Sequence, residues 1–159
     1  MLNAIRPASF GSVSHGTMRD EDLLDALSYE LAYQMKRQTA RFPRRELRAL
    51  INEAKRTLSA GEDSPLWEGA TDVVAELFDA LEQFAPAYGY FGALPGDGSD
   101  YGFWLSDEIE HNFDGPKVTD LNEVAPAYRG EVLQISDHGN MTLLTATGRG
   151  TFSVIWSLV

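Results

Sequence analysis

A chain of 159 residues, 43% of them hydrophobic, is long enough to bury one core of its own, and we expect a single domain over residues 1–159. The absence of cysteine excludes disulfides, thiol nucleophiles and cysteine–zinc sites, and no apolar run approaches the roughly 18 residues that a membrane span requires. The N-terminal residues form no apolar segment of a secretion signal, so we expect a cytoplasmic protein without membrane association.

The formal net charge of −11 is unevenly distributed along the chain. Residues 36–56 contain eight basic and two acidic side chains, whereas the remainder contains five basic and 22 acidic ones. Such a protein repels nucleic acid over most of its surface and attracts basic protein surfaces. We therefore expect a protein partner with a basic surface rather than nucleic acid.

The N-terminal residues predict an arm followed by a helix. Residues 1–16 show no sustained hydrophobic period and are rich in serine and glycine, which predicts an extended N-terminal arm. Thr17 and Asp20 then match the capping-box pattern, in which two side chains bond to the backbone amides of a helix's first turn. Leucines recur at helical spacing from there on, so a core-facing helix is predicted from Thr17 to about Thr39.

Two further helices are predicted before the chain changes character. Residues 43–60 carry an apolar stripe with arginines on the opposite face, and Gly61 marks the expected end of this helix. Ser64 and Pro65 suit the N-cap and the first position of a third helix, which Pro86 ends.

Residues 88–105 have the composition of a β-hairpin. Aromatic-rich arms at residues 88–94 and 101–105 flank the sequence PGDGSD at residues 95–100. Proline, glycine and aspartate tolerate or pre-set turn conformations, so we expect a wide loop between the two arms.

The remainder of the chain predicts strands and turns. Short helical turns are expected at residues 106–111 and 120–124, with an edge strand at residues 117–119 between them. Three strands joined by hairpin-length connections then predict an antiparallel meander over residues 131–136, 141–147 and 151–158.

Together, these patterns predict an α+β fold with three N-terminal helices packed on a mostly antiparallel sheet of about five strands. The helices belong to a helical part at residues 17–86, and the strands belong to a β-rich part at residues 87–159. Helices that cover one face of the sheet bury the apolar side of both layers.

Asp97 and Asp100 are the first candidates for chemistry, because two carboxylates in a glycine-rich loop could hold a calcium ion. Their spacing does not match the EF-hand pattern, which needs acidic residues at alternate positions and a closing glutamate. The glycines also lack the Lys-Ser/Thr pair that completes a phosphate-binding loop. We therefore interpret the segment as a turn and expect no metal and no cofactor. A small metal-dependent enzyme that uses Asp97 and Asp100 is the alternative.

The histidines and serines form no recognisable catalytic constellation. Ser14, His15 and Thr17 crowd the start of the first predicted helix, but no orienting group, oxyanion hole or Gly-x-Ser-x-Gly elbow accompanies them. We interpret these three residues as a polar cap that holds the N-terminal arm. His111 and His138 do not have metal-ligand spacing. We therefore expect a protein that is not an enzyme.

Two kinds of surface are candidates for binding a partner. The first combines the aromatic hairpin with the acidic segment after it, and its candidate residues are Asp97, Asp100, Tyr101, Trp104, Asp107, Glu108 and Glu110. The second is the basic face of the helix at residues 43–60 and the turn before it, with candidates Arg41, Arg44, Arg45 and Arg48. A basic helix can contact phosphate, although a protein this acidic favours a solvated helix face.

Several segments resemble a family of small, uncharacterised proteins encoded by plasmids, integrative elements and phages of proteobacteria. They are SVSHGTMRDEDL, which begins at Ser12, residues 76–86, and YFGALPGDGSDYGFW at residues 90–104, where GDGxDxGFW is the most specific piece. Residues 130–133 and 137–143 also fit, so the resemblance covers about half of the chain. The helix at residues 43–60 does not fit the pattern of the family.

The resemblance carries over no catalytic residue. It implies that the gene lies on mobile DNA, which must survive host defence. We expect a non-catalytic, acidic, protein-binding accessory protein of a mobile genetic element or phage, and specifically an inhibitor of host defence of the anti-CRISPR or anti-restriction type. Its expected partner is a host nucleic-acid-binding defence complex with a basic surface. The alternative is a DNA-maintenance module that binds through the basic helix at residues 43–60.

Overall fold

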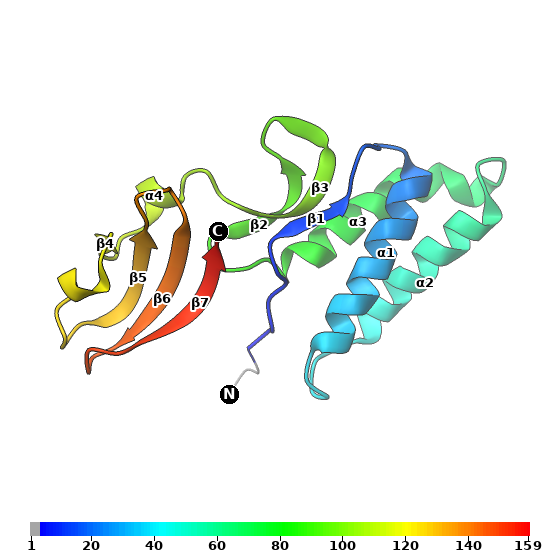
Figure 1. Cartoon of the computed structure of the whole chain (residues 1–159). Coiled ribbons are helices and arrows are strands. Elements are labelled where there is room, and N and C mark those ends of the chain that lie inside the picture. Colours follow the sequence, from blue (N-terminus) through cyan, green and yellow to red (C-terminus); the bar gives the residue numbers. More distant parts are fainter. Residues whose placement is uncertain (1–3) are drawn as a thin grey trace. The chain divides into compact units, whose positions relative to one another are not determined.

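The computed structural model of the chain describes residues 4–159 (Figure 1). These residues form two compact units, the first ending at Ser106 and the second comprising Asp107–Val159. The long helices lie in the N-terminal half and most strands in the C-terminal half, so the predicted α+β class is confirmed. The prediction that residues 1–159 form a single domain stays a prediction.

The first unit combines helices with a small antiparallel sheet. Its helices are α1 (Asp20–Arg37), α2 (Arg45–Ala60), the 3₁₀ helix η1 (Pro65–Gly69) and α3 (Ala70–Glu82). Its strands are β1 (Gly11–Ser14), β2 (Gly89–Leu94) and β3 (Asp97–Leu105), hydrogen-bonded in the order β1-β3-β2. Helix α1 contacts β1 and α3 contacts β2, while α2 packs on α1 and α3.

The core of the first unit lies between the helices and this sheet. Leu27 on α1 and Leu77 on α3 are completely buried, because the apolar residues of each helix recur on one face. From the sheet, Phe91 and Phe103 pack with their ring centroids 4.8 Å apart, and the ring of Phe78 on α3 lies 5.3 Å from that of Phe91. Within residues 4–159, no helix is long and apolar enough to cross a membrane.

The start of α1 differs from the predicted capping box. The helix begins at Asp20, and the side chain of its N-cap residue Arg19 makes no capping hydrogen bond. Thr17 Oγ1 accepts a hydrogen bond from the backbone amide of Arg19 at 3.2 Å and donates one to Asp22 at 2.6 Å. The carboxylate of Asp20 accepts a hydrogen bond from Thr71 at 2.8 Å. The predicted box is therefore wrong, because both of its members have other partners.

The third predicted helix starts as expected, whereas the second starts two residues later than the predicted first position at Pro43. The hydroxyl of Ser64 accepts a hydrogen bond from a backbone amide of the following turn, and Pro65 is the first residue of the helical turn, as predicted. That turn is the 3₁₀ helix η1, which leads into α3. Helix α2 starts at Arg45, two residues after Pro43, and its C-cap Gly61 has the positive φ of 79° that favours glycine.

The aromatic hairpin forms, but its turn is tighter than predicted. The pairing of β2 with β3 extends to Leu94 and Asp97, so only Pro95 and Gly96 lie in the turn. Gly96 has a φ of 87°, the conformation that glycine adopts after proline in a tight turn. The predicted wide loop over residues 95–100 is therefore wrong, because the chain from Asp97 onward already belongs to strand β3.

The second unit contains the predicted meander. Its elements are α4 (Ile109–Asn112), β4 (Lys117–Val118), the 3₁₀ helix η2 (Leu121–Glu123), β5 (Arg129–Ile135), β6 (Met141–Thr147) and β7 (Phe152–Leu158). The strand order is β4-β5-β6-β7, with β4 parallel to β5 and the remaining pairs antiparallel. A small core forms where Val132 and Ala146 pack with Val124, next to Tyr128 and Phe152.

The predicted single sheet of about five strands is wrong, because the strands of residues 4–159 divide between two sheets of three and four strands. The sequence predicts an extended N-terminal arm without a strand, and it predicts that the hairpin and the meander share one sheet. Residues 11–14 of the arm instead form β1, which pairs with β3 and completes the hairpin's own sheet. Residues 1–3 of the predicted arm lie outside the described residues.

The position of the aromatic side chains on β3 generates a stability prediction. Phe103 is 1% exposed in the core, whereas its neighbour Trp104 is half-buried and donates a hydrogen bond from Nε1 to the carbonyl of Gly92 at 3.0 Å. We expect Phe103→Ala to lower the free energy of unfolding by about 3–5 kcal/mol. Trp104→Ala should cost only about 1–2 kcal/mol. Urea denaturation followed by the helical circular-dichroism signal measures both values, and equal losses would contradict this packing.

Candidate functional site

Two polar segments that are far apart in the sequence meet at the pairing of β1 with β3. Strand β1 runs antiparallel to β3 with Ser14 opposite Tyr101, and a bulge interrupts the register between Ser12 and Ser14. The contact continues past the end of β1, where the backbone amide of Gly16 donates to the carbonyl of Ser99 at 3.0 Å. His15 lies between Ser14 and Gly16 in the chain, so these two contacts hold it beside the first residues of β3.

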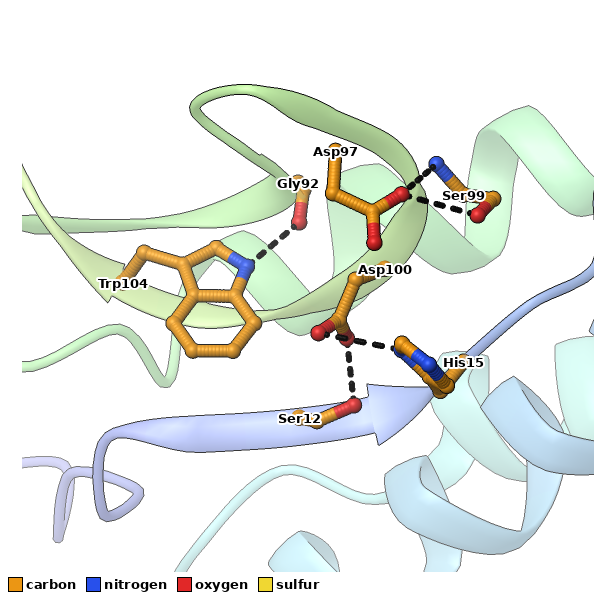
Figure 2. A network of polar contacts seen from close by, with 7 residues as sticks. All are labelled: Ser12, His15, Gly92, Asp97, Ser99, Asp100 and Trp104. Carbon is orange, nitrogen blue, oxygen red and sulfur yellow. Dashed lines mark hydrogen bonds and ion pairs between the residues drawn. The ribbon is translucent and has the colours of Figure 1, made fainter.

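Asp100 is the centre of the resulting polar network (Figure 2). Its Oδ1 accepts a hydrogen bond from the hydroxyl of Ser12, and its Oδ2 lies 3.2 Å from Nδ1 of His15. Asp100 is buried, whereas 68% of the His15 side chain is exposed. The network therefore joins a buried carboxylate on β3 to an imidazole that solvent can reach.

Asp97 lies on the same strand, and its partner is Ser99 on that strand. Its Oδ1 accepts hydrogen bonds from the hydroxyl of Ser99 at 2.8 Å and from the backbone amide of Ser99 at 3.0 Å (Figure 2). The hydroxyl and then the amide of Ser99 lower the pKa of Asp97 against a small opposing effect of burial, and the nearby His15 lowers it further. Asp97 is therefore ionised at neutral pH.

His15, Asp97 and Asp100 together form a group with metal-ligand chemistry. One ligand atom from each of the three side chains lies within 4.8 Å of the other two, which gives one imidazole nitrogen and two carboxylate oxygens. The hydroxyl of Ser12 donates to Asp100 rather than to the imidazole. The arrangement is suited to holding a cation.

The predicted polar cap does not form as one cluster. His15 contacts Asp100, and Ser14 is buried within β1. Thr17 bonds to the first turn of α1 through Asp22. The sequence patterns missed the partners Ser12 and Ser99, and they placed His15 apart from the two aspartates. Only the pairing of β1 with β3 brings these residues together, and no local spacing encodes it.

The two aromatic candidates of the hairpin make structural contacts. The ring of Tyr101 packs edge-on against Phe78 at a centroid distance of 5.1 Å. The indole of Trp104 is fixed by its hydrogen bond to the carbonyl of Gly92 (Figure 2). Both side chains are half-buried. Their part in binding a partner stays a prediction.

The three acidic candidates beyond the hairpin belong to the second unit. Asp107, Glu108 and Glu110 are exposed and lie at the start of α4. Glu108 accepts a hydrogen bond from Asn112 at 3.2 Å, and the ammonium group of Lys117 donates to the carbonyl of Glu110. Of the seven predicted interaction residues, the structure thus brings together Asp97 and Asp100 with His15 and leaves the acidic trio as a separate group.

One residue of the predicted basic face, Arg44, forms hydrogen bonds within the protein. The guanidinium of Arg44 donates hydrogen bonds to the carbonyls of Met35 and Gln38 at the C-terminal end of α1 and to those of Ala40 and Phe42 in the following turn, at 3.0–3.3 Å. Carbonyls at a helix C-terminus lack intrahelical donors, and a cation there also interacts favourably with the helix dipole. Arg44 is therefore a capping residue of α1.

The remaining basic candidates are solvent-facing. Arg41, Arg45 and Arg48 are exposed, and within residues 4–159 none of them forms an ion pair. Shallow hollows along α2 are lined by Arg45, Arg48 and Asn52 on one side and by Lys55 and Arg56 further along. Comparisons with protein-family models, curated proteins and solved structures gave no significant match for this chain.

The two classes of arginine on the basic face should differ in their effect on stability. Arg44→Ala removes four hydrogen bonds from a charged donor, two to carbonyls at the end of α1 and two to carbonyls of the following turn, and we expect it to lower the free energy of unfolding by about 1–3 kcal/mol. The matched control Arg45→Ala removes an exposed side chain without such contacts and should change stability by less than about 0.5 kcal/mol. Urea denaturation of both variants measures the difference, and an unaffected Arg44→Ala protein would overturn the capping role.

Proposed function

We propose that this chain is a non-catalytic, protein-binding accessory protein of a mobile genetic element, and that it inhibits a host defence complex of the CRISPR or restriction type by binding its basic surface. The genomic setting rests on the resemblance of the segments at Ser12 and at residues 90–104 to proteins of plasmids, integrative elements and phages. The binding mode rests on the charge of helix α3, which is the observation that carries the proposal.

Helix α3 presents an acidic face that has no internal partner. Asp72, Glu76 and Asp79 are exposed at positions i, i+4 and i+7, while the apolar residues of the helix are buried. The 13 residues of the helix include no lysine or arginine. Within residues 4–159, no basic side chain lies within 4.0 Å of these three carboxylates, the distance that defines an ion pair.

Such a face costs the isolated protein some helix stability. Like charges three or four residues apart on a helix destabilise it by roughly 0.2–0.5 kcal/mol per pair. Asp72 gains from the positive end of the helix dipole, but Glu76 and Asp79 lie beyond the first turn. A basic partner surface would compensate the repulsion, so this charge pattern suits a helix that binds such a surface.

The charge pattern also supports an orientation of the complex. The acidic α3 and the arginine-bearing α2 pack against each other within the first unit, so opposite charges occupy neighbouring helices. Complementary potentials speed diffusional encounter and fix the docking register, and like charges exclude wrong orientations. A partner with a basic nucleic-acid channel would meet α3 and be repelled by α2.

A DNA-maintenance module is the second candidate, and one observation favours it. Arg45, Arg48 and Arg56 are exposed on α2 and have no carboxylate partner within residues 4–159. The acidic remainder of the protein opposes the phosphate backbone, however, and Arg44 is already engaged by carbonyl oxygens of the fold. We therefore rank protein binding above DNA binding.

Charge reversal on α3 tests the proposed function. The partner is captured from a proteobacterial lysate with the wild-type protein, identified by mass spectrometry and purified, and its association rate is then measured at increasing salt. We expect fast association at low salt that slows steeply as salt screens the charges, since the Debye length is about 8 Å at physiological ionic strength. The triple variant Asp72→Lys, Glu76→Lys and Asp79→Lys should associate at least about tenfold more slowly.

The matched control is the double variant Arg45→Gln and Arg48→Gln, which alters exposed charges on α2 and leaves Arg44 in place. It should keep the wild-type association rate and the wild-type protection of a plasmid against CRISPR or restriction in cells. The DNA-maintenance alternative predicts a different result. In that case the wild-type protein binds duplex DNA tightly at physiological salt, and this binding is lost in the α2 variant and kept in the α3 variant.

A further inference from the structure

We propose that His15, Asp97 and Asp100 form a binding site for a divalent transition-metal ion, for which Zn²⁺ is the best-suited candidate. The site joins the segment after β1 to the start of β3. It is independent of the acidic face of α3 and does not rest on the proposed function.

The distances between the three side chains fit one small ion. Metal–ligand bonds of about 2.1 Å place the ligands of a tetrahedral zinc ion about 3.4 Å apart. His15 Nδ1 and Asp100 Oδ2 already lie 3.2 Å apart, and the ligand atom of Asp97 completes a set in which no separation exceeds 4.8 Å. The three ligand atoms are therefore close enough to approach one common ion.

The charge balance of the group points to a cation. Asp100 is a buried carboxylate, and buried carboxylates are normally paired with a basic side chain or bound to a metal. Within residues 4–159, no lysine or arginine lies within ion-pair distance of either Asp97 or Asp100. The one nitrogen base at the group is His15, which as a neutral imidazole is itself a metal ligand.

The supporting residues orient the carboxylates as a metal site requires. Ser12 donates a hydrogen bond to Oδ1 of Asp100 and Ser99 donates one to Oδ1 of Asp97, so a serine hydroxyl holds each carboxylate (Figure 2). Hydrogen-bonded supporting groups of this kind orient metal ligands and raise the affinity of the site. The exposed side of His15 leaves a path for the ion and a coordination position for water.

The ligand types favour zinc over calcium or magnesium. An imidazole nitrogen combined with carboxylate oxygens suits Zn²⁺, whereas Ca²⁺ needs six to eight oxygen ligands and Mg²⁺ prefers oxygens in octahedral geometry. A bound zinc ion would tie the N-terminal segment to the hairpin across 85 residues of chain, from His15 to Asp100. The site would thus act as a structural clamp on β1.

Titration of the untagged protein with ZnCl₂ by isothermal calorimetry, together with thermal unfolding, tests the site. We expect one zinc ion per chain and a melting temperature that rises with Zn²⁺ and does not rise with millimolar Ca²⁺. His15→Ala and Asp97→Asn each remove one ligand at an exposed or half-exposed position and should weaken Zn²⁺ binding by roughly 100-fold or more, while Ser99→Ala should weaken it by about tenfold.

The control variant His138→Ala removes an exposed histidine of the second unit and should bind Zn²⁺ like the wild type. Failure of the wild-type protein to bind Zn²⁺ at millimolar concentration would overturn the proposal, and so would unchanged binding in both His15→Ala and Asp97→Asn. A rise in melting temperature with Ca²⁺ that equals the rise with Zn²⁺ would show that the imidazole does not select the ion. Loss of zinc binding would leave the charge-reversal results on α3 unaffected, so the two proposals fail separately.

Discussion

The pairing of β1 with β3 depends on a glycine, Gly102, at a point where the two strands come close together. A Cβ atom on Gly102 would lie 2.2 Å from the carbonyl oxygen of Gly11 and 2.8 Å from the Cα of Ser12, so any other residue would push β1 away. The close approach allows the N-terminal segment to become the third strand of the sheet. A two-stranded hairpin alone is marginally stable and leaves its edges unpaired, which a third strand partly corrects.

The same contact brings the polar residues of the candidate metal site together. Because β1 ends opposite Tyr101 and Gly16 bonds to the carbonyl of Ser99, His15 lies against Asp100, and Ser12 bonds to the other oxygen of that carboxylate. A bulge in β1 shifts the register between Ser12 and Ser14, which lets residues on either side of it reach the same strand. The fold of the first unit and the geometry of the candidate metal site therefore have a common cause.

Local signals in the sequence predicted the elements that are specified locally. Ser64, Gly61 and the recurring leucines act within one or two turns of helix, and the meander is specified by short connections between apolar strands. The segment GSVS of β1 shows no such signal, since its hydrophobic content is a single valine and its pairing partner lies almost 90 residues away. Aspartate and glycine after Pro95 have turn propensity, but strand pairing overrode it once the two-residue turn had formed.

The accessible charge of the protein differs from its formal charge in a way that bears on partner choice. Of the basic residues at positions 36–56, Arg44 is bound to carbonyl oxygens, and Arg37 donates to Gln34 and lies over the ring of Tyr33 at 5.7 Å. Both side chains are half-buried, so a polyanion would find a weaker basic face than the sequence suggests. On α3, Glu82 accepts a hydrogen bond from the backbone amide of Phe91, whereas Asp72, Glu76 and Asp79 form no ion pair among the described residues. Because a partner responds to exposed and uncompensated charge, this asymmetry is one reason why we propose a basic protein rather than DNA as the partner.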